Sequence, residues 1–498
     1  MAVAGGTVIW LGTEESARGR FDGADEVVEL HGAFVAAAFV DAHVHATSTG
    51  LLLDGLDLTR TTSLRECLDT VARHASARPG AVLWGHGWDE TSWPEARPPS
   101  RTELDRAAAG TAVYLSRIDA HSAAVSSALL VRAPDAVRAD GWSSEGPLSR
   151  EAHHPARRAA RESITPAQRT DAQRMFLTHA AARGVAVVHE CAGPDISGAD
   201  DLAGLLALDA GVEVIGYWGQ PVATSEQATE LLAATGAHGL AGDLCCDGAI
   251  GSRTAALCRP YADAPGNRGV TYLDADAVAA HLVACSLAGT QAGFHVIGDA
   301  ATGTVLAGLA TAETQLGAAA LRARTHRVEH LEMVDAEQAG QLARAGVVAS
   351  VQPAFDAAWG GPDGMYALRL GKPRAAAMNP FATLERAGMV LAFGSDTPVT
   401  GVEPWAAVRA AAHHRTPGSG ISPAAAFTAH TRAGYRAGGG TDPLAGTLVP
   451  GAPASYAVWD AEPDLASPEA ESPRCLRTVH HGRTIFDREG ALPEPSRH

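Results

Sequence analysis

The chain has 498 residues, 19% of them charged, and a formal net charge of −17 at pH 7. No run of Lys or Arg forms a stripe that could follow a phosphate backbone, so the composition argues against a nucleic-acid partner. Apolar runs such as 33–40 are far shorter than the ~20 residues that span a membrane, and no basic segment followed by an apolar one opens the chain. We therefore expect a soluble, cytoplasmic protein without a membrane partner.

The seven cysteines point to the same compartment. Their number is odd and no two of them have Cys-x-x-Cys spacing. The sequence thus indicates neither a disulfide framework nor a zinc ribbon, and it favours a reducing environment.

The two ends of the chain share a β character. Residues 7–35 alternate loosely between apolar and polar side chains and contain a turn at 21–23, and residues 446–486 have the same texture. We predict one small β-sandwich domain that is formed jointly by residues 1–38 and 446–498.

Between these ends, strand-like and helix-like segments alternate. Helical spacing is seen at Leu64, Cys67 and Val71, and again at 278–285 before Gly289, a plausible helix stop. We predict an α/β fold, a (β/α)8 TIM barrel over residues 39–445 with its site at the carboxyl ends of the strands. The predicted strands are 39–45, 112–119, 185–190, 242–247, 291–297, 325–331, 347–352 and 390–396.

Two long intervals interrupt the early part of this barrel. They cover about 50–110 and 131–165, and we interpret them as insertions over the barrel mouth. Loops in that position usually determine which substrate is accepted.

The first predicted barrel strand carries the most informative residues. Because side chains alternate along a strand, Asp41, His43 and His45 point to one face, where both imidazoles can reach one metal ion. Neutral imidazoles suit Zn²⁺ or a similar divalent ion. Among 21 histidines some close pairs arise by accident, so a pair of hydrogen-bonded core histidines is the competing interpretation.

Four later apolar runs end in side chains that could complete such a site. They end in Asp243 and Asp247, in His295, in His326 and His330, and in Asp396. His326 and His330 share a face whether their run is a strand or a helix, and we place His326 behind the ligands. A carboxylate such as Asp396 beside a metal-bound water can take its proton and return it to the leaving amine. The competing role for Asp396 is a helix N-cap.

In order and spacing, these motifs resemble the amidohydrolase superfamily over nearly the whole chain. Within it, they resemble the amidohydrolase 3 branch, which includes N-substituted formamide deformylase and the YtcJ-like proteins. The residues that carry the resemblance are Asp41 to His45, Arg117 to His121, Asp247 to Ala255, His295 to Ala300, His326 to His330 and Gly394 to Pro398.

The resemblance implies that His295 binds metal, and that His330 either binds a second metal or polarises the substrate carbonyl. It also implies a carboxylated lysine on the fourth strand, but this sequence has Asp243 there. The only lysine, Lys372, lies far along the chain. Asp243 or Glu190 could supply the missing carboxylate. The number of divalent ions, one or two, remains open, and the ligand types favour zinc.

Four further residues lie in the matched motifs just outside these ligands. They either hold substrate or form ion pairs at the barrel mouth, and the sequence favours neither role. They are Asp119, His121, Arg253 and Asp299.

Together these features predict a metal-dependent amidohydrolase that cleaves a non-peptide carbon–nitrogen bond in a small amide, formamide, carbamate or cyclic amide. In this interpretation Asp396 and His330 are catalytic. The alternatives are a deaminase or esterase with the same mononuclear site, and a catalytically impaired barrel that binds a ligand. The expected partner is a small-molecule substrate, and a homodimer is the default assembly.

Overall fold

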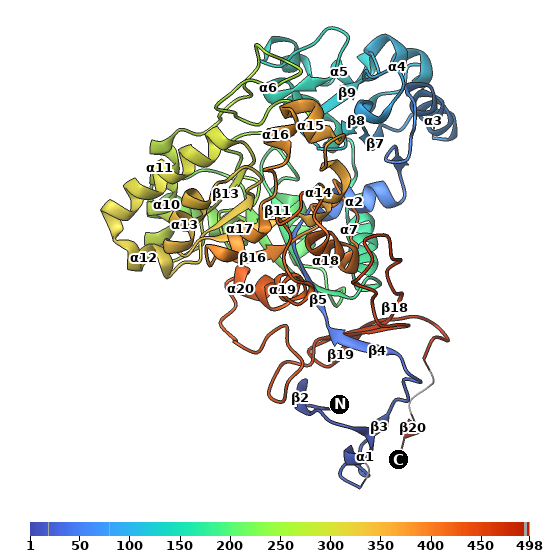
Figure 1. Ribbon diagram of the computed structural model, residues 1–498. Coiled ribbons are helices and arrows are strands. Elements are labelled where there is room, and N and C mark those ends of the chain that lie inside the picture. Colours follow the sequence, from blue (N-terminus) through green and yellow to red (C-terminus); the bar gives the residue numbers. More distant parts are fainter. Residues whose placement is uncertain (18, 79, 493–495, 498) are drawn as a thin grey trace.

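The computed structural model describes residues 1–17, 19–78, 80–492 and 496–497. Figure 1 shows three parts along one axis: a β-rich region that contains both termini, a barrel surrounded by helices, and a smaller α/β layer beyond the barrel. The predicted terminal segments 1–38 and 446–498 include residues 18, 493–495 and 498, and the predicted insertion at 50–110 includes residue 79. These six positions lie outside the described residues.

The central part is a (β/α)8 barrel, as predicted. Within the described residues, seven strands form two parallel arcs, β12-β11-β5 and β13-β14-β15-β16. Parallel bridges from Tyr217 to Gly239, from Leu240 to Ala292 and from Cys245 to His295 place residues 239–245 between the arcs, and a bridge from Val44 to Thr397 closes the circle. The strands are β5 (Phe39–Val44), β11 (Val185–Ala192), β12 (Glu213–Trp218), β13 (Gly293–Val296), β14 (Arg327–His330), β15 (Val348–Val351) and β16 (Val390–Phe393).

Helices surround this barrel (Figure 1). The longer ones bury one face against the strands, as α10 does with Val278, Leu282 and Cys285. Gly289 ends α10 in a left-handed conformation, as the sequence predicts. The helices are α2 (Ala46–Leu53), α7 (Pro166–Ala181), α8 (Ala199–Leu206), α9 (Ser225–Thr235), α10 (Ala275–Ala288), α11 (Asp299–Leu316), α12 (Ala318–Arg322), α13 (Ala336–Arg344), α14 (Pro353–Trp359), α15 (Met365–Leu370), α16 (Lys372–Ala375), α17 (Phe381–Arg386), α18 (Pro404–Ala412), α19 (Pro423–Ala429) and α20 (Arg432–Ala437).

Two strand predictions are wrong. The segment predicted as 112–119 is a strand, but it belongs to a separate sheet, and the barrel instead uses β12, which was not predicted. The segment predicted as 242–247 joins the barrel only through isolated bridges. Gly242 has a left-handed φ of 76°, which interrupts regular pairing there.

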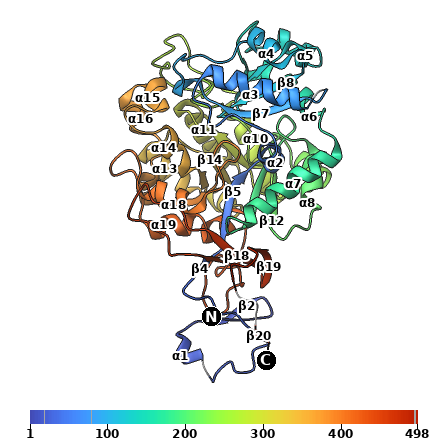
Figure 2. The ribbon, with the colours of Figure 1, turned by 90° about the vertical axis from the view of Figure 1, so that its right-hand side faces the viewer.

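The layer beyond the barrel, which we name the cap, spans residues 56–161. Its sheet has the order β10-β9-β8-β7-β6 and is covered by helices, and Figure 2 shows it above the end of the barrel to which β5 runs. Its strands are β6 (Leu56–Asp57), β7 (Leu83–Trp88), β8 (Val113–Arg117), β9 (Ser122–Val125) and β10 (Leu148–Ser149). Its helices are α3 (Leu64–Ala77), α4 (Arg101–Ala108), α5 (Ser127–Leu130) and α6 (Arg150–Arg161), with 3-10 turns at Glu90–Ser92 and Pro134–Arg138.

At the opposite end, N- and C-terminal segments share a four-stranded antiparallel sheet of order β19-β18-β17-β4. Since β4 runs directly into β5, this sheet is joined to the first barrel strand (Figure 2). The strands are β4 (Phe34–Ala37), β17 (Tyr456–Trp459), β18 (Cys475–His480) and β19 (Arg483–Asp487). Two further pairs, β1 (Ala2–Ala4) with β2 (Thr7–Trp10) and β3 (Glu26–Val27) with β20 (Ser496–Arg497), and helix α1 (Glu14–Ala17) complete this region.

None of the helices in the described part of the chain combines the length and apolar character that a membrane crossing requires.

Candidate metal centre

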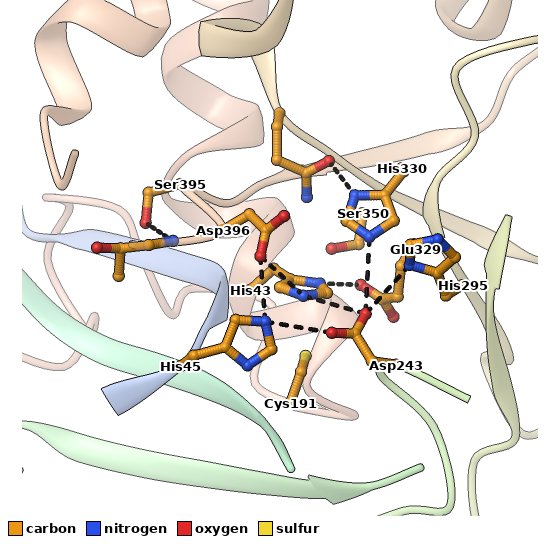
Figure 3. Close-up of polar contacts among 12 residues, drawn as sticks. His43, His45, Cys191, Asp243, His295, Glu329, His330, Ser350, Ser395 and Asp396 are labelled. Atoms are coloured by element: carbon orange, nitrogen blue, oxygen red, sulfur yellow. Dashed lines mark hydrogen bonds and ion pairs between the residues drawn. The ribbon is translucent and has the colours of Figure 1, made fainter. Parts of the chain in front are cut away.

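Six side chains that the sequence predicts as ligands meet at the carboxyl ends of the barrel strands. Figure 3 shows them facing one another around a common centre, although they come from five different parts of the chain. They are His43, His45, Asp243, His295, His330 and Asp396.

Four of the six form a closed ring. Nε2 of His43 lies 3.4 Å from Oδ1 of both Asp243 and Asp396. Nε2 of His45 lies 3.2 Å from Oδ2 of Asp243 and 3.2 Å from Oδ1 of Asp396. Each imidazole therefore contacts both carboxylates (Figure 3).

The ring nitrogen of His43 that faces away from this centre is held by Glu329. Nδ1 of His43 donates to Oε2 of Glu329 at 3.0 Å, and both side chains are fully buried. Arg327 holds Glu329 in turn through Nε at 2.6 Å, and its own side chain donates to the carbonyl of Ala42 at 2.7 Å. This series of hydrogen bonds keeps a proton on Nδ1 of His43 and leaves the lone pair of its Nε2 directed at the centre.

His330 reaches the centre through an unusual backbone conformation. Arg327 and Glu329 point into the barrel, so regular alternation would turn the next residue outward. His330 instead has a left-handed φ of 69°, which brings its Nε2 to 3.6 Å from Oδ1 of Asp243. Its Nδ1 donates to Oε1 of Gln352 at 2.8 Å.

His326, predicted to lie behind the ligands, is not part of this site. It precedes β14, accepts a hydrogen bond from the amide of Ala292 at 2.9 Å, and lies 3.0 Å from the hydroxyl of Ser286 in α10. The prediction was wrong because His330 departs from the alternation on which the shared face of the two residues depends.

Asp396 follows β16 and faces His43 and His45. The residue has a left-handed φ of 54°, and its amide donates to the carbonyl of His43 at 2.8 Å. Gly394 permits this approach, since a Cβ there would lie 2.6 Å from the amide nitrogen of His43. The next helix begins only at Pro404, so Asp396 is not a helix N-cap.

Asp243, and not Glu190, supplies the carboxylate beside the histidines. One oxygen of Asp243 also lies 3.4 Å from Nδ1 of His295. The carboxylate of Glu190 accepts from the amide of Ala46 at 2.7 Å instead. The lysine, Lys372, is exposed and lies 3.4 Å from Asp363.

The carboxylates and imidazoles shift one another's titration. Burial alone would lower the pKa of His45, but its contacts with Asp243 and Asp396 raise it to about 9. Burial would raise the pKa of Asp396, yet the charge of His43 and the close contact with His45 hold it below its ordinary value. Each group thus favours the charged form of its neighbours, so the centre attracts a cation when the imidazoles are neutral.

These groups fit a divalent metal ion. Nε2 of His43 and Oδ1 of Asp396 are buried and have no hydrogen-bond partner among the described residues. Ligand atoms at roughly 2.0–2.1 Å from a tetrahedral ion are about 3.3–3.4 Å apart. The four ring distances of 3.2–3.4 Å are close to that spacing, with Oδ1 of Asp243 facing His43 and its Oδ2 facing His45.

A cavity of about 300 Å³ opens beside this centre. Its walls combine His45 and Asp243 with cap residues, among them Trp84, Tyr114 and Arg157. A second, narrower space of about 30 Å³ lies between His295, His330 and the apolar side chains of Phe355 and Trp359. The centre is therefore open to a small molecule from the cap side.

Of the four predicted outer residues, three already have protein partners. Asp119 accepts from Arg117 at 2.9 Å. The guanidinium of Arg253 is paired with Asp263 at 2.6 Å, and Asp299 accepts from the amide of Cys258 at 2.8 Å. His121 differs, because it borders both spaces and its ring centroid lies 4.9 Å from that of His295.

The sequence interpretation gave no role to Glu329, Gln352 or Arg157. For Glu329 a signal was present, because Arg327 and Glu329 alternate on a strand that ends in a candidate ligand. Gln352 and Arg157 come from other elements, and the sequence around them contains no pattern that indicates a functional role.

The comparisons with known proteins agree with the predicted resemblance. The sequence profile of the amidohydrolase family matches residues 26–486. The chain is 26% identical to the protein LONG AFTER FAR-RED 3 of Arabidopsis thaliana, over 92% of this chain and 84% of that protein. It is 27% identical to YtcJ of Bacillus subtilis (strain 168), over 78% and 74%. An uncharacterized metal-dependent hydrolase from Pyrococcus horikoshii OT3 has the same fold, with a TM-score of 0.72, 24% identity, and coverage of 94% of this chain and 95% of that one.

Proposed function

Because this chain belongs to the amidohydrolase family, we propose that it is a metal-dependent hydrolase that cleaves a non-peptide carbon–nitrogen bond in a small amide, formamide, carbamate or cyclic amide. The observation that carries this proposal is the ring of two imidazoles and two carboxylates with edges of 3.2–3.4 Å, beside a cavity of about 300 Å³. Zinc suits these nitrogen and oxygen ligands.

In this proposal His43, His45, Asp243 and Asp396 hold one ion. A bound divalent ion would supply Lewis acidity and lower the pKa of water. His43 belongs to three groups of potential ligands, one with His45 and Asp396, one with Asp243 and His330, and one with Cys191 and Glu329. Its Nδ1 is engaged by Glu329, so the first two groups share its Nε2. That sharing favours one ion at this position.

Asp396 is the proposed proton carrier. Its carboxylate borders the narrower space and contacts both histidines of the first strand, so it can take a proton from water at the centre and return it to the departing amine nitrogen. His330 borders the same space and would orient the substrate carbonyl.

Two alternatives use the same residues. A deaminase or esterase could use the same mononuclear centre, and a catalytically impaired barrel could bind a ligand without turning it over. Metal stoichiometry of the purified protein separates these classes: a value near zero favours the binder, near one the mononuclear enzyme, and near two a bridged site.

The test is the double variant His43→Ala, His45→Ala, assayed for metal by emission spectroscopy and for hydrolysis of a panel of N-formyl and N-acetyl amines. We expect loss of both the metal and the hydrolysis, with an unchanged circular dichroism spectrum. The matched control is His31→Gln, which alters an exposed histidine between β3 and β4, outside the barrel. An unchanged metal content in the double variant would remove these two residues from the ligand set.

A further inference from the structure

A second group of potential metal ligands lies at the other end of the barrel. The described residues contain four such groups, and the one without His43 consists of Glu213, His480 and His481. Glu213 is the first residue of β12, so it lies at the amino end of the barrel strands, opposite the metal centre. Figure 2 shows β12 and the β18–β19 hairpin together at this end.

The turn of the hairpin brings two consecutive histidines to the same side. Consecutive residues of a strand point to opposite faces, so the side chains of His480 and His481 would diverge in a regular strand. His480 instead pairs with Arg483, and the two residues between them, His481 and Gly482, have left-handed φ values of 48° and 79°. As a result, the two imidazole rings have centroids only 4.3 Å apart.

Hydrogen bonds hold this turn in place. The amide of His481 donates to Oγ of Ser455 at 3.1 Å, and the amide of Gly482 donates to the carbonyl of Ala454 at 2.8 Å. Nδ1 of His480 lies 3.1 Å from the same Oγ of Ser455. This hydroxyl can accept the proton of Nδ1 and leave the Nε2 lone pair of His480 for a ligand.

Close packing brings Glu213 to the two histidines. Oε2 of Glu213 lies 3.1 Å from Nε2 of His480. The hairpin can approach β12 because residue 211 is a glycine with a left-handed φ of 85°, where a Cβ would lie 2.6 Å from Cγ2 of Ile485. The potential ligand atoms of Glu213, His480 and His481 all lie within 4.8 Å of one another.

The three residues border a hollow of about 320 Å³ on the surface. Arg483 borders the same hollow, but its guanidinium is paired with Asp209 at 3.0 Å. The positive charge of Arg483 is therefore compensated, and the carboxylate of Glu213 faces only imidazoles among its printed contacts. A cation can enter this hollow without first displacing an arginine.

We propose that Glu213, His480 and His481 bind a divalent ion, zinc or a similar borderline metal, that joins the terminal sheet to the barrel. Two imidazole nitrogens and one carboxylate oxygen form a ligand set that suits Zn²⁺, with a further position for water. The ligands come from segments 267 positions apart in the chain, so one ion would stabilise the contact between them.

This ion is held less firmly than an ion at the buried centre. The side chain of Glu213 is 46% exposed and that of His480 is 10% exposed, whereas that of His43 is fully buried. We expect the ion at the hairpin to be removed by gel filtration in metal-free buffer and to bind again in a titration. The metal content of the filtered protein then counts the barrel centre alone.

The experiment titrates Zn²⁺ into the filtered protein and measures binding by calorimetry. We expect one further ion per chain in the parent. Loss of a partner behind a ligand costs roughly 10- to 100-fold in affinity, so loss of a ligand itself in Glu213→Ala or His480→Ala should cost at least ~10-fold. The matched control is Asp209→Ala, which removes a carboxylate at the same hollow that is paired with Arg483, and it should bind the further ion as the parent does.

Two results would overturn the inference. One is a parent that binds no further ion, and the other is equal affinity in the parent, Glu213→Ala and His480→Ala. The double variant His43→Ala, His45→Ala locates the ion independently, since it should still bind an ion at the hairpin. Loss of the further ion in that variant, together with its retention in Glu213→Ala, would assign it to the barrel centre.

Thermal unfolding tests whether the ion joins the two regions. A ligand that binds only the folded state stabilises it, so excess Zn²⁺ should raise the Tm of the filtered parent. The Tm of His480→Ala should not rise under the same conditions. A rise of the same size in both proteins, or no rise in the parent, would contradict the joining role.

Discussion

Glu329 accepts a hydrogen bond from Nδ1 of His43 at 3.0 Å, inside a barrel where both side chains are completely buried. The two residues lie 286 positions apart in the chain. A carboxylate behind a ligating imidazole fixes its tautomer and raises its basicity. Glu329 thus has a defined part in metal binding although it does not face the centre.

We therefore predict that Glu329→Gln weakens metal binding by roughly 10- to 100-fold, the usual effect of losing such a partner. Metal affinity is measured by competition with a chromogenic chelator. The control is Asp201→Asn, which alters another buried carboxylate, one that accepts from Thr47 at 2.7 Å and does not contact the histidines. Equal affinity in Glu329→Gln and the parent would mean that Glu329 serves only to neutralise Arg327.

The second prediction concerns the proton carrier. Asp396→Asn should keep most of the metal, because an amide oxygen can still coordinate, but lower kcat by roughly 100-fold or more, the scale of a lost general acid or base. Steady-state kinetics on any amide that the parent hydrolyses provides the measurement, with Asp299→Asn as the control outside the centre. If kcat stays within a few-fold of the parent, another residue carries the proton.

The third prediction separates Asp243 from the carboxylated lysine that the family resemblance implies. Activity should not respond to added bicarbonate, since no amine is available at the centre. Asp243→Lys should lose metal at neutral pH, because an ammonium group would lie beside the cation. Glu190→Gln, which removes a carboxylate bonded to the amide of Ala46, should retain the metal. A gain of metal by Asp243→Lys in bicarbonate would show instead that the position tolerates a bridging carbamate.

The fourth prediction is a pH dependence of stability that originates in a histidine outside the centre. His281 of α10 accepts from the amide of Val222 at 3.2 Å and donates to the carbonyl of Leu240 at 2.9 Å, an arrangement that requires the neutral ring. Burial lowers the pKa of His281 to about 4, from 6.5 in the unfolded chain. Between these values the unfolded state binds the extra proton, so this contribution is complete above pH 6.5 and is lost as the pH falls toward 4.

Urea unfolding at several pH values measures this contribution. In His281→Gln, the dependence of the unfolding free energy on pH between 4 and 6.5 should be shallower by up to about 1.4 kcal/mol per pH unit, the limit for one titrating group. His31→Gln, at an exposed position, should retain the slope of the parent. Parallel slopes in the parent and His281→Gln would assign the pH dependence to other groups.

Local sequence alone determined the barrel and most of the centre. Side chains alternate along a strand, so the spacing of His43 and His45 placed both imidazoles on one face before any partner was known. The helix ending at Gly289 was equally local, because only a residue without a Cβ adopts the left-handed conformation freely. Position at the carboxyl end of a strand indicated His295 and Asp396 as possible ligands, and the family resemblance implied that His295 binds metal.

Only the tertiary structure decided which sheet each strand joins and which charges are paired. The strand β8 is buried throughout, so its sequence does not distinguish a strand of the cap from a strand of the barrel. The strand β12 begins with an exposed Glu213, and for this reason the sequence did not indicate it as a barrel strand. Pairing depends on distance in space, which joins Glu329 to His43 and surrounds Asp243 with imidazoles. No local pattern contains that information, because the partners of each group come from elements that only the folded barrel brings together.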